Sequence, residues 1–255
     1  MKSITCDPAR LEYVLRLADN ALIHGQRLSQ WCGQGPVLEE DLALTNIALD
    51  LIGQARLLLT HAGKLEGLGR DEDQLAFLRD QGAYRNVTLV ELPNGDFART
   101  VVRNLLMSAF HVVQWRALQG SSDAELAAIA AKSLKEANYH LQHASDWTVR
   151  LGDGTEESHR RAQASLDALW PYASELFVPD GIDDVAGSAG VGVPCASLES
   201  EWHALVDPVL SEATLSVPAP TPFRSRGKAG VHTEHLGHLL SEMQYLQRAY
   251  PDARW

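Results

Sequence analysis

Cysteines and long apolar runs are both scarce in this chain. Its 255 residues include three cysteines, Cys6, Cys32 and Cys195, and no C-x-x-C pair. This number and spacing argue against a disulfide framework, a structural zinc site and a redox dithiol. No run of about 18 consecutive apolar residues is present, and residues 1–10 lack the basic head and apolar segment of a signal peptide. We therefore expect a cytoplasmic protein without a membrane-spanning segment.

Basic residues are in the minority. The chain has 22 Lys and Arg against 33 Asp and Glu, which gives a formal charge of −11, and no cluster of more than two basic residues. Nucleic acids are bound through a basic surface, so this class of function is excluded. The serine-hydrolase elbow, the phosphate-binding loop and the dinucleotide fingerprint are absent as well. Nucleophilic hydrolysis, nucleotide phosphate binding and NAD chemistry therefore have no support.

Helical periodicity is present along most of the sequence. Apolar residues recur at helical spacing, with caps before and glycine or proline after most segments. The predicted long helices cover residues 8–31, 39–63, 97–118 and 124–151. The predicted shorter helices cover residues 73–80, 155–171, 198–213 and 233–249. With no convincing strand, the pattern predicts an all-α fold, an up-and-down four-helix bundle with additional helices.

The length suits a single domain over residues 1–255. A hydrophobic fraction of 45% and a charged fraction of 22% are those of an ordinary globular protein. Two stretches rich in glycine or proline, near residues 178–197 and 214–230, are predicted to be irregular connections.

Polar residues interrupt the apolar faces of the long helices. Residues three, four or seven apart share one face of a helix, so such residues form lines. The lines are Asn20 and His24; Asn46, Asp50 and Gln54; Asn104, Ser108 and His111; and Glu136, His140 and His143. Glu and His that point into a four-helix bundle are the ligands of di-iron carboxylate centres. The lines therefore raise the question of a metal site.

The ligand spacing of that centre is not met. It takes one Glu from each of two helices and a Glu-x-x-His pair from each of the other two. The only literal pair, Glu156 and His159, opens a helix just after Gly154. Acidic residues in a first turn are explained by the helix dipole. We interpret this pair as a solvated first turn.

For Asp50, Glu136, His140 and His143 we favour a hydrogen-bonded polar network in the bundle core, with Arg103 as counter-ion. Buried charge is tolerated when it is paired or hydrogen-bonded, and the helices supply such partners without a metal. Metal binding by these residues stays open as the alternative. We predict no catalytic, cofactor-binding or metal-ligating residue in this chain.

The last predicted helix carries a dense group of titratable residues, His232, Glu234, His235, His238 and Glu242. An amphipathic pattern follows them, which favours a packing or interface face over a metal site. Large apolar side chains elsewhere exceed what one core face of each helix needs, and we treat them as candidate partner contacts or core. They are Leu57, Leu58, Leu59, Phe110, Trp115, Trp147 and Trp170.

Several long segments, in order along nearly the whole chain, resemble the C subunits of bacterial phenylacetyl-CoA epoxidases, the ring 1,2-epoxidases of phenylacetate degradation. They are residues 27–33 (RLSQWCG), 41–56 (DLALTNIALDLIGQAR), 135–141 (KEANYHL), 232–237 (HTEHLG) and 242–248 (EMQYLQR). The resemblance implies a ferritin-like structural subunit that lacks iron ligands. It agrees with the ligand spacing, which independently argues against a metal site.

The resemblance also implies partners. A catalytic sister subunit would hold the di-iron centre and add one oxygen atom to the ring of phenylacetyl-CoA. A separate reductase with FAD and an iron–sulfur cluster would supply electrons from NADPH. The chain would pair with its sister in a hetero-oligomer, with the acyl-CoA near the subunit seam. Tyr84, Arg85 and Asn86 offer a flat ring and a phosphate-binding fork, and we predict a CoA contact there.

Two other functions remain open. The chain could be a catalytic di-iron oxygenase with a non-standard ligand set that includes Asp50, Glu136 and His140. It could also be a free-standing ferritin-like oligomer that binds or stores metal, although the missing Glu-x-x-His pairs weigh against this. The leading hypothesis is a non-catalytic structural subunit of an oxidoreductase complex.

Overall fold

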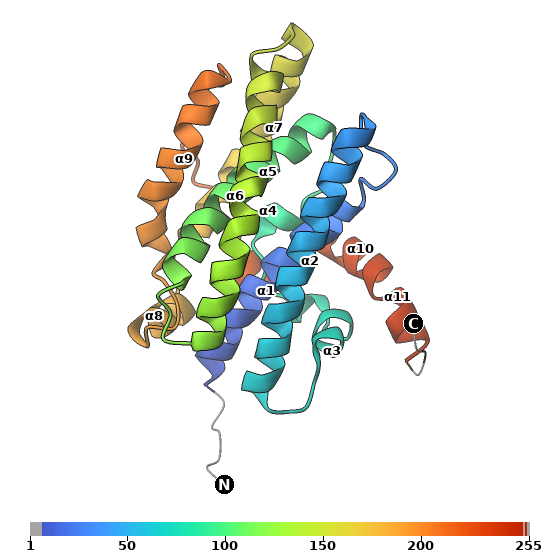
Figure 1. Ribbon diagram of the computed structural model, residues 1–255, viewed down its shortest axis with the longest axis vertical. Helices are drawn as coiled ribbons and strands as arrows, with labels where there is room; N and C mark the ends of the chain where they lie inside the picture. The colour runs from blue at the N-terminus through green and yellow to red at the C-terminus, as the bar shows by residue number, and fades with distance from the viewer. Residues whose placement is uncertain (1–6, 252, 254–255) are drawn as a thin grey trace. The chain divides into compact units, whose positions relative to one another are not determined.

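A computed structural model describes residues 7–251 and 253 (Figure 1). Within these residues the chain forms helices and no strand, with a single isolated bridge between Arg226 and Val231. The α-helices are α1 (Pro8–Ser29), α2 (Leu38–Glu66), α3 (Glu72–Phe77), α4 (Thr88–Glu91), α5 (Phe97–Leu118), α6 (Ala124–Gly152), α7 (Glu156–Ala173), α8 (Gly181–Ser188), α9 (Glu199–Glu212), α10 (Glu234–Met243) and α11 (Tyr245–Ala249). Short 3-10 turns are η1 (Gln81–Ala83), η2 (Ser174–Leu176), η3 (Cys195–Leu198) and η4 (Gly227–Ala229). The predicted all-α, ferritin-like fold class is confirmed.

The described residues divide into two compact units. Unit 1 takes its residues from 1–34, 41–93 and 226–255, and unit 2 from 35–40 and 94–225. Unit 1 contains α1 and nearly all of α2, while unit 2 contains α5 and α6. Each unit therefore holds two of the four long helices. The single domain over residues 1–255 stays a prediction.

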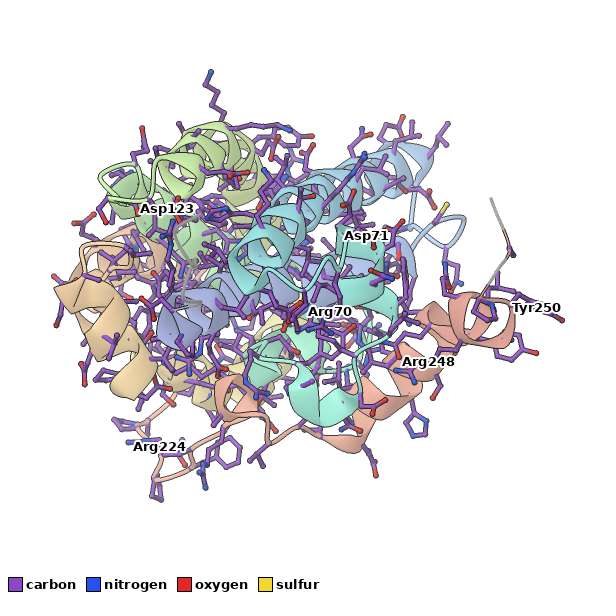
Figure 2. The ribbon with its side chains drawn as sticks, turned by 90° about the horizontal axis from the view of Figure 1, so that it is seen from below. Arg70, Asp71, Asp123, Arg224, Arg248 and Tyr250 are labelled. Carbon is purple, nitrogen blue, oxygen red and sulfur yellow. The ribbon has the colours of Figure 1, made fainter. Side chains whose placement is uncertain are left out.

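In unit 1, local capping fixes where two helices begin. The Asp7 carboxylate accepts hydrogen bonds from the backbone N–H of Ala9 and Arg10, and Pro8 occupies the first turn of α1, where its missing N–H costs nothing. Asp71 begins α3 with a reciprocal capping box to Gln74. Figure 2 shows Asp71 next to Arg70 on the loop that leaves α2.

In unit 2, α5 is buried along most of its length and packs on α6, α7 and α9. Asp96, Asp123 and Thr155 cap α5, α6 and α7 with their side-chain oxygens. Trp202 of α9 is 1% exposed, and its indole N–H donates to the carbonyl of Leu106 at 2.9 Å. The core of unit 2 is therefore built from helix faces and aromatic rings.

Two predicted helix ends are wrong. The second helix does not stop at Gly63 but continues to Glu66, and Gly63 is instead a point of close approach. A Cβ atom there would lie 2.3 Å from the carbonyl oxygen of Arg70. The last helix breaks at Gln244, whose buried amide donates to the carbonyls of Ala76 and Arg79 at 3.1 and 3.0 Å. The contact at Gly63 is with a residue only seven positions away, whereas the contacts of Gln244 are with residues more than 160 positions away.

Other differences concern the connections and the apolar surplus. The stretch 178–197 is not wholly irregular, because Asp180 caps the eight-residue helix α8 within it. Leu58, Leu59, Phe110 and Trp115 are core residues rather than exposed partner contacts, while Leu57 is 37% exposed. Cys32 and Cys195 are free thiols, and Cys6 lies outside the described residues.

Candidate functional site

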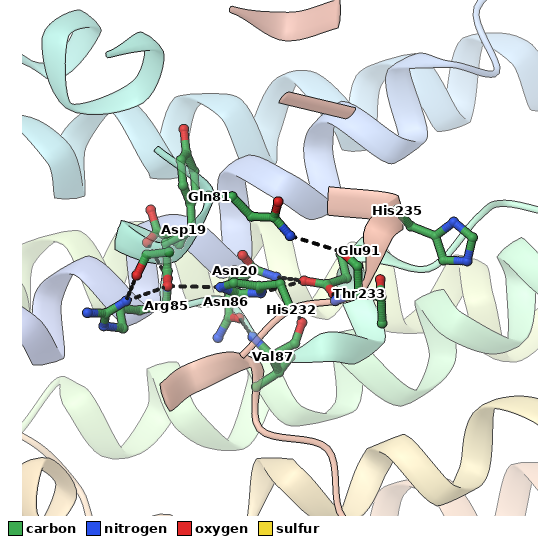
Figure 3. A network of polar contacts seen from close by, with 12 residues as sticks. Asp19, Asn20, Gln81, Arg85, Asn86, Val87, Glu91, His232, Thr233 and His235 are labelled. Atoms are coloured by element: carbon green, nitrogen blue, oxygen red, sulfur yellow. Dashed lines mark hydrogen bonds and ion pairs between the residues drawn. The ribbon is translucent and has the colours of Figure 1, made fainter. Parts of the chain in front are cut away.

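The main polar cluster of unit 1 joins four segments that are far apart in sequence (Figure 3). Its side chains come from α1, from residues 84–87 after η1, from α4, and from the segment that precedes α10. Segments 84–91 and 232–235 are separated by about half the chain, so hydrogen bonds between them are long-range contacts that hold the C-terminal segment in place. Two carboxylates, Glu91 and Asp19, organise the cluster.

Glu91 is fully buried, and both of its carboxylate oxygens are used. Oε2 lies 2.7 Å from Nδ1 of His232 and accepts a hydrogen bond from the Asn86 amide at 2.9 Å. Oε1 accepts from the backbone N–H of Thr233 at 2.6 Å. The second ring nitrogen of His232, Nε2, lies 3.0 Å from the carbonyl oxygen of Tyr84. Glu91 thus binds the C-terminal segment and the loop after η1 at the same time.

Asp19 forms a second centre on α1. Its side chain is 0% exposed and makes a bidentate ion pair with Arg79, whose Nη1 lies 3.0 Å from Oδ2. Asp19 also accepts the backbone N–H of Arg85 at 2.8 Å, and the Arg79 guanidinium lies over the Tyr84 ring at 4.4 Å. Asn20, the next residue, accepts the backbone N–H of Val87 at 2.8 Å. One turn of α1 therefore fixes the path of residues 84–87.

Arg27 of α1 completes the cluster by binding backbone rather than carboxylates. Its Nε and Nη2 donate to the carbonyl of Glu91 at 3.0 and 2.6 Å, and Nη2 also donates to the carbonyl of His235 at 3.1 Å. A guanidinium can bind two carbonyls in one plane, which suits it to join two segments. α4 and the start of α10 are held together through it.

Burial and hydrogen bonding act in opposite directions on the pKa of His232. Burial lowers it, but the hydrogen bonds to Glu91 and to the Tyr84 carbonyl, together with the charges of Glu91 and Asp19, outweigh burial and raise it above the ordinary value. Burial raises the pKa of the Tyr84 phenol. The surroundings therefore favour the protonated forms of both the His232 ring and the Tyr84 phenol.

The three residues predicted to contact CoA belong to this cluster. Tyr84 and Asn86 are fully buried, with the Tyr84 hydroxyl donating to Ala76 and the Asn86 amide donating to Glu91. Arg85 is partly exposed and donates from Nε to Glu12 at 2.8 Å. Two of the three predicted contact residues are thus enclosed by the protein. The CoA contact itself stays a prediction.

The predicted metal alternatives have other partners. His143 Nε2 lies 2.8 Å from Glu40 Oε2, and Glu136 lies 3.7 Å from the ammonium group of Lys132. His159 Nδ1 lies 2.7 Å from the carbonyl of Gly152 at the end of α6, so it satisfies a helix end instead of pairing with Glu156. Across the part of the chain that the structure describes, no group of three or more His, Cys, Asp or Glu side chains could hold a metal ion.

The polar lines face inward only in part. Gln54 and Asn104 are buried, whereas Asn46 is exposed on α2. His111 is 2% exposed, and burial together with the nearby His140 lowers its pKa to about 3. Arg103 is also buried, and its guanidinium donates to the side-chain oxygen of Asn94.

Sequence reasoning missed the residues that organise the cluster: Asp19, Arg27, Arg79 and Glu91. One signal was available, because Arg16, Asn20 and Arg27 recur at four and seven residues along α1 and so share a face with Asp19. A charged face on an otherwise apolar helix predicts buried ion pairs. Nothing local marks Glu91 or Arg79 as their partners.

Comparisons with known proteins cover the whole of this architecture. Residues 3–255 match the family described as phenylacetic acid catabolic protein. The chain is 49% identical over 243 residues to the C subunit of the 1,2-phenylacetyl-CoA epoxidase of Escherichia coli (strain K12), and the match covers 95% of this chain and 98% of that protein. The resemblance inferred from the sequence is confirmed, and the chain belongs to the family of phenylacetic acid catabolic proteins.

Proposed function

We propose that the chain is a non-catalytic structural subunit of a multicomponent di-iron monooxygenase that epoxidises the aromatic ring of phenylacetyl-CoA. The observation that carries this proposal is the full-length identity of 49% to the C subunit of such an epoxidase. A match that covers both chains almost end to end favours the same place in the same kind of assembly. The partner is then the iron-bearing catalytic subunit.

The distribution of metal donors supports a non-catalytic role. A di-iron centre needs several carboxylates and histidines around two adjacent ions. The described residues include no such group, and His143 and Glu136 already have ion-pair partners. The di-iron centre is therefore assigned to the sister subunit, with FAD, the iron–sulfur cluster and NADPH assigned to a reductase. We assign the assembly to the cytoplasm.

α2 offers a surface for the partner. By length and composition it is the one described helix that could cross a membrane. Core helices of soluble proteins share this property, and 44% of the apolar window of α2 is buried. Leu42 is 54% exposed, Leu49 is 60% exposed and Leu57 is 37% exposed. They recur at seven and eight residues and so line one face. An apolar face of this kind suits a permanent subunit interface.

Arg85 is the residue through which the chain would contact the substrate. Of the three predicted CoA contacts it alone has a partly exposed side chain, 23% of it. Its Nε and Nη1 are held by Glu12 and by two carbonyls, so the guanidinium is fixed at the surface of unit 1. A fixed guanidinium suits a phosphate of CoA.

The direct test is to purify the chain alone, and together with the catalytic subunit, after anaerobic loading with ferrous ion. We expect iron only in the catalytic subunit, and epoxidation of phenylacetyl-CoA only when both subunits and the reductase are present. About two irons retained by the chain alone, with epoxidation in the absence of the sister, would overturn the proposal in favour of the catalytic alternative.

The partner surface is tested separately with Leu42→Asp and Leu49→Asp. Each removes a leucine whose burial is worth about 1.5 kcal/mol or more, so affinity for the sister subunit should fall at least about tenfold per substitution. Val185→Asp on α8 is the matched control, because Val185 is 49% exposed and lies elsewhere. Equal binding of all three variants in a titration would remove α2 from the interface.

A further inference from the structure

Both ring nitrogens of His232 face oxygen acceptors. Nδ1 lies 2.7 Å from a carboxylate oxygen of Glu91, Nε2 lies 3.0 Å from the carbonyl of Tyr84, and the side chains of His232 and Glu91 are 0% exposed. A neutral imidazole has one N–H and one lone pair, so it can donate to only one of these oxygens. Its lone pair would then face the other oxygen at direct contact distance.

The carboxylate of Glu91 is better suited to the ionised form than to the acid. Besides His232 it accepts from the Asn86 amide and from the backbone N–H of Thr233. Three donors around one carboxylate stabilise its charge. The proton between Glu91 and His232 therefore resides on the ring, and the pair is an imidazolium and a carboxylate.

Several charged and titratable groups lie on the elements that contact this pair. They are Asp19 and Arg27 on α1, Arg79 after α3, Tyr84 and Arg85 before α4, Lys228, Glu234 and His235 near His232 in sequence, and Glu242 of α10, whose charge acts on Arg27. Asp19 is paired with Arg79, Arg85 with Glu12, and Arg27 binds carbonyl oxygens. Glu91 is thus the carboxylate in contact with the ring. Figure 3 shows His235 pointing away from it.

His232 sits where the C-terminal arm, defined here as residues 226–249, joins the rest of unit 1. Next to it Thr233 donates its backbone N–H to Glu91, and the His235 carbonyl accepts from Arg27. Gly227 packs so closely that a Cβ atom would lie 2.4 Å from the carbonyl oxygen of Asn86. A change in the His232–Glu91 pair therefore acts directly on the attachment of the arm.

We infer that the His232–Glu91 pair is a proton-operated latch, in which the imidazolium holds the C-terminal arm on unit 1 and loss of its proton opens the arm. After that loss, either Nδ1 presents a lone pair to the Glu91 carboxylate or Nε2 presents one to the Tyr84 carbonyl. Both arrangements leave two acceptors in contact in a buried site, which is costly. Opening lets water relieve this contact.

The direction of the pH response follows from proton linkage. In the open arm His232 has an ordinary pKa of about 6.5, and in the closed arm its pKa is higher. The latch is therefore complete below about pH 6.5 and is lost as the pH rises through the closed-state value. Over that interval the opening constant should rise by up to about tenfold per pH unit.

Hydrogen–deuterium exchange of the full chain, corrected for intrinsic exchange, measures arm opening between pH 6 and pH 9.5. In the wild type we expect the opening of residues 233–249 to increase as the pH rises through the closed-state pKa of His232 and to level off above it. Glu91→Gln should abolish the increase, because the introduced amide can donate to Nδ1 of a neutral ring while Nε2–H still reaches the Tyr84 carbonyl. His203→Gln is the control, since His203 contacts Asp207 at 3.0 Å on the surface of unit 2 and should leave the arm unchanged.

Nitrogen NMR of the imidazole ring gives a second readout that does not depend on a variant arm staying folded. A His232 ring that loses its second proton above the ordinary value of about pH 6.5, with its signals assigned by their absence in His232→Gln, supports the latch. A ring that loses this proton at or below about pH 6.5 would overturn it. A wild-type arm whose corrected exchange does not vary with pH, or a Glu91→Gln variant with an unaltered increase, would overturn it as well.

Discussion

Units 1 and 2 each enclose a histidine side chain, and the pKa values of the two rings are shifted in opposite directions. His232 in unit 1 touches a carboxylate and a carbonyl oxygen, and hydrogen bonds to both raise its pKa despite burial. His111 in unit 2 lies 6.4 Å from the Phe110 ring and 6.3 Å from the Trp115 ring, and burial lowers its pKa to about 3. The pKa of one ring is thus raised by its polar partners, whereas the pKa of the other is lowered by burial.

The direction of each shift follows from the causes that act on the ring. Oxygen atoms at both nitrogens of His232 compensate the cost of burying a cation, whereas burial and the charge of His140 disfavour the cation at His111. Unit 1 contains buried ion pairs and a histidine with a raised pKa, so its free energy of unfolding should fall at alkaline pH. Unit 2 keeps its buried ring neutral and should lose stability in acid.

The largest loss of stability is expected when one partner of a buried ion pair in unit 1 is removed. Asp19→Ala leaves the guanidinium of Arg79 buried, with 4% of that side chain exposed and no carboxylate beside it. We expect a loss of about 3–5 kcal/mol in the free energy of unfolding, as for other broken buried pairs. Urea denaturation followed by circular dichroism measures it.

An exposed ion pair in unit 2 serves as the control for that change. Arg116 and Glu201 lie 3.3 Å apart, but 53% and 62% of their side chains are exposed. Glu201→Ala should change stability by less than about 0.5 kcal/mol, because water screens such pairs. If the two substitutions cost the same, burial of charge is not what distinguishes unit 1.

The acid response of unit 2 can be assigned to one ring. His111 stays neutral in the fold down to about pH 3, while the unfolded chain takes up a proton below about pH 6.5. The wild type should therefore lose up to about 1.4 kcal/mol per pH unit below pH 6.5, or roughly 2 kcal/mol by pH 5.

His111→Gln removes that ionisation, so the variant should lose less stability between pH 7.5 and pH 5 than the wild type. Two urea titrations per protein, one at each pH, provide the comparison. The assignment to His111 fails if both proteins lose the same amount.

Some helix ends of the two units could be predicted from the sequence and others could not. The boundaries of α5 and the start of α6 follow from Asp96 and Asp123, because capping and periodicity are local signals. The end at Gly63 was missed because this glycine serves a close approach to Arg70 and not a helix stop. The break at Gln244 was missed because its amide binds carbonyls of Ala76 and Arg79, which no local pattern connects with it.

Even less of the candidate site could be predicted from local patterns in the sequence. The polar residues at 20 and 84–86 stood out by type, and the structure places them in one cluster. The predicted role of residues 84–86 was a CoA contact, whereas two of these three side chains are buried. Burial depends on Glu91 and His232, which are separated by 141 residues in the chain. Pairing across that distance is a property of the fold.

The last substitution tests whether the stability of unit 2 is independent of pH between pH 7.5 and pH 9.5. Trp202→Phe shortens one ring and removes the hydrogen bond from the indole N–H to the Leu106 carbonyl. That carbonyl lies inside α5 and keeps its helical partner, so the loss should be only about 1–2 kcal/mol, mainly from lost packing. Because the substitution changes no titratable group, the loss should be equal at pH 7.5 and pH 9.5. A loss that grows with pH would show that unit 2 shares the proton dependence assigned to unit 1.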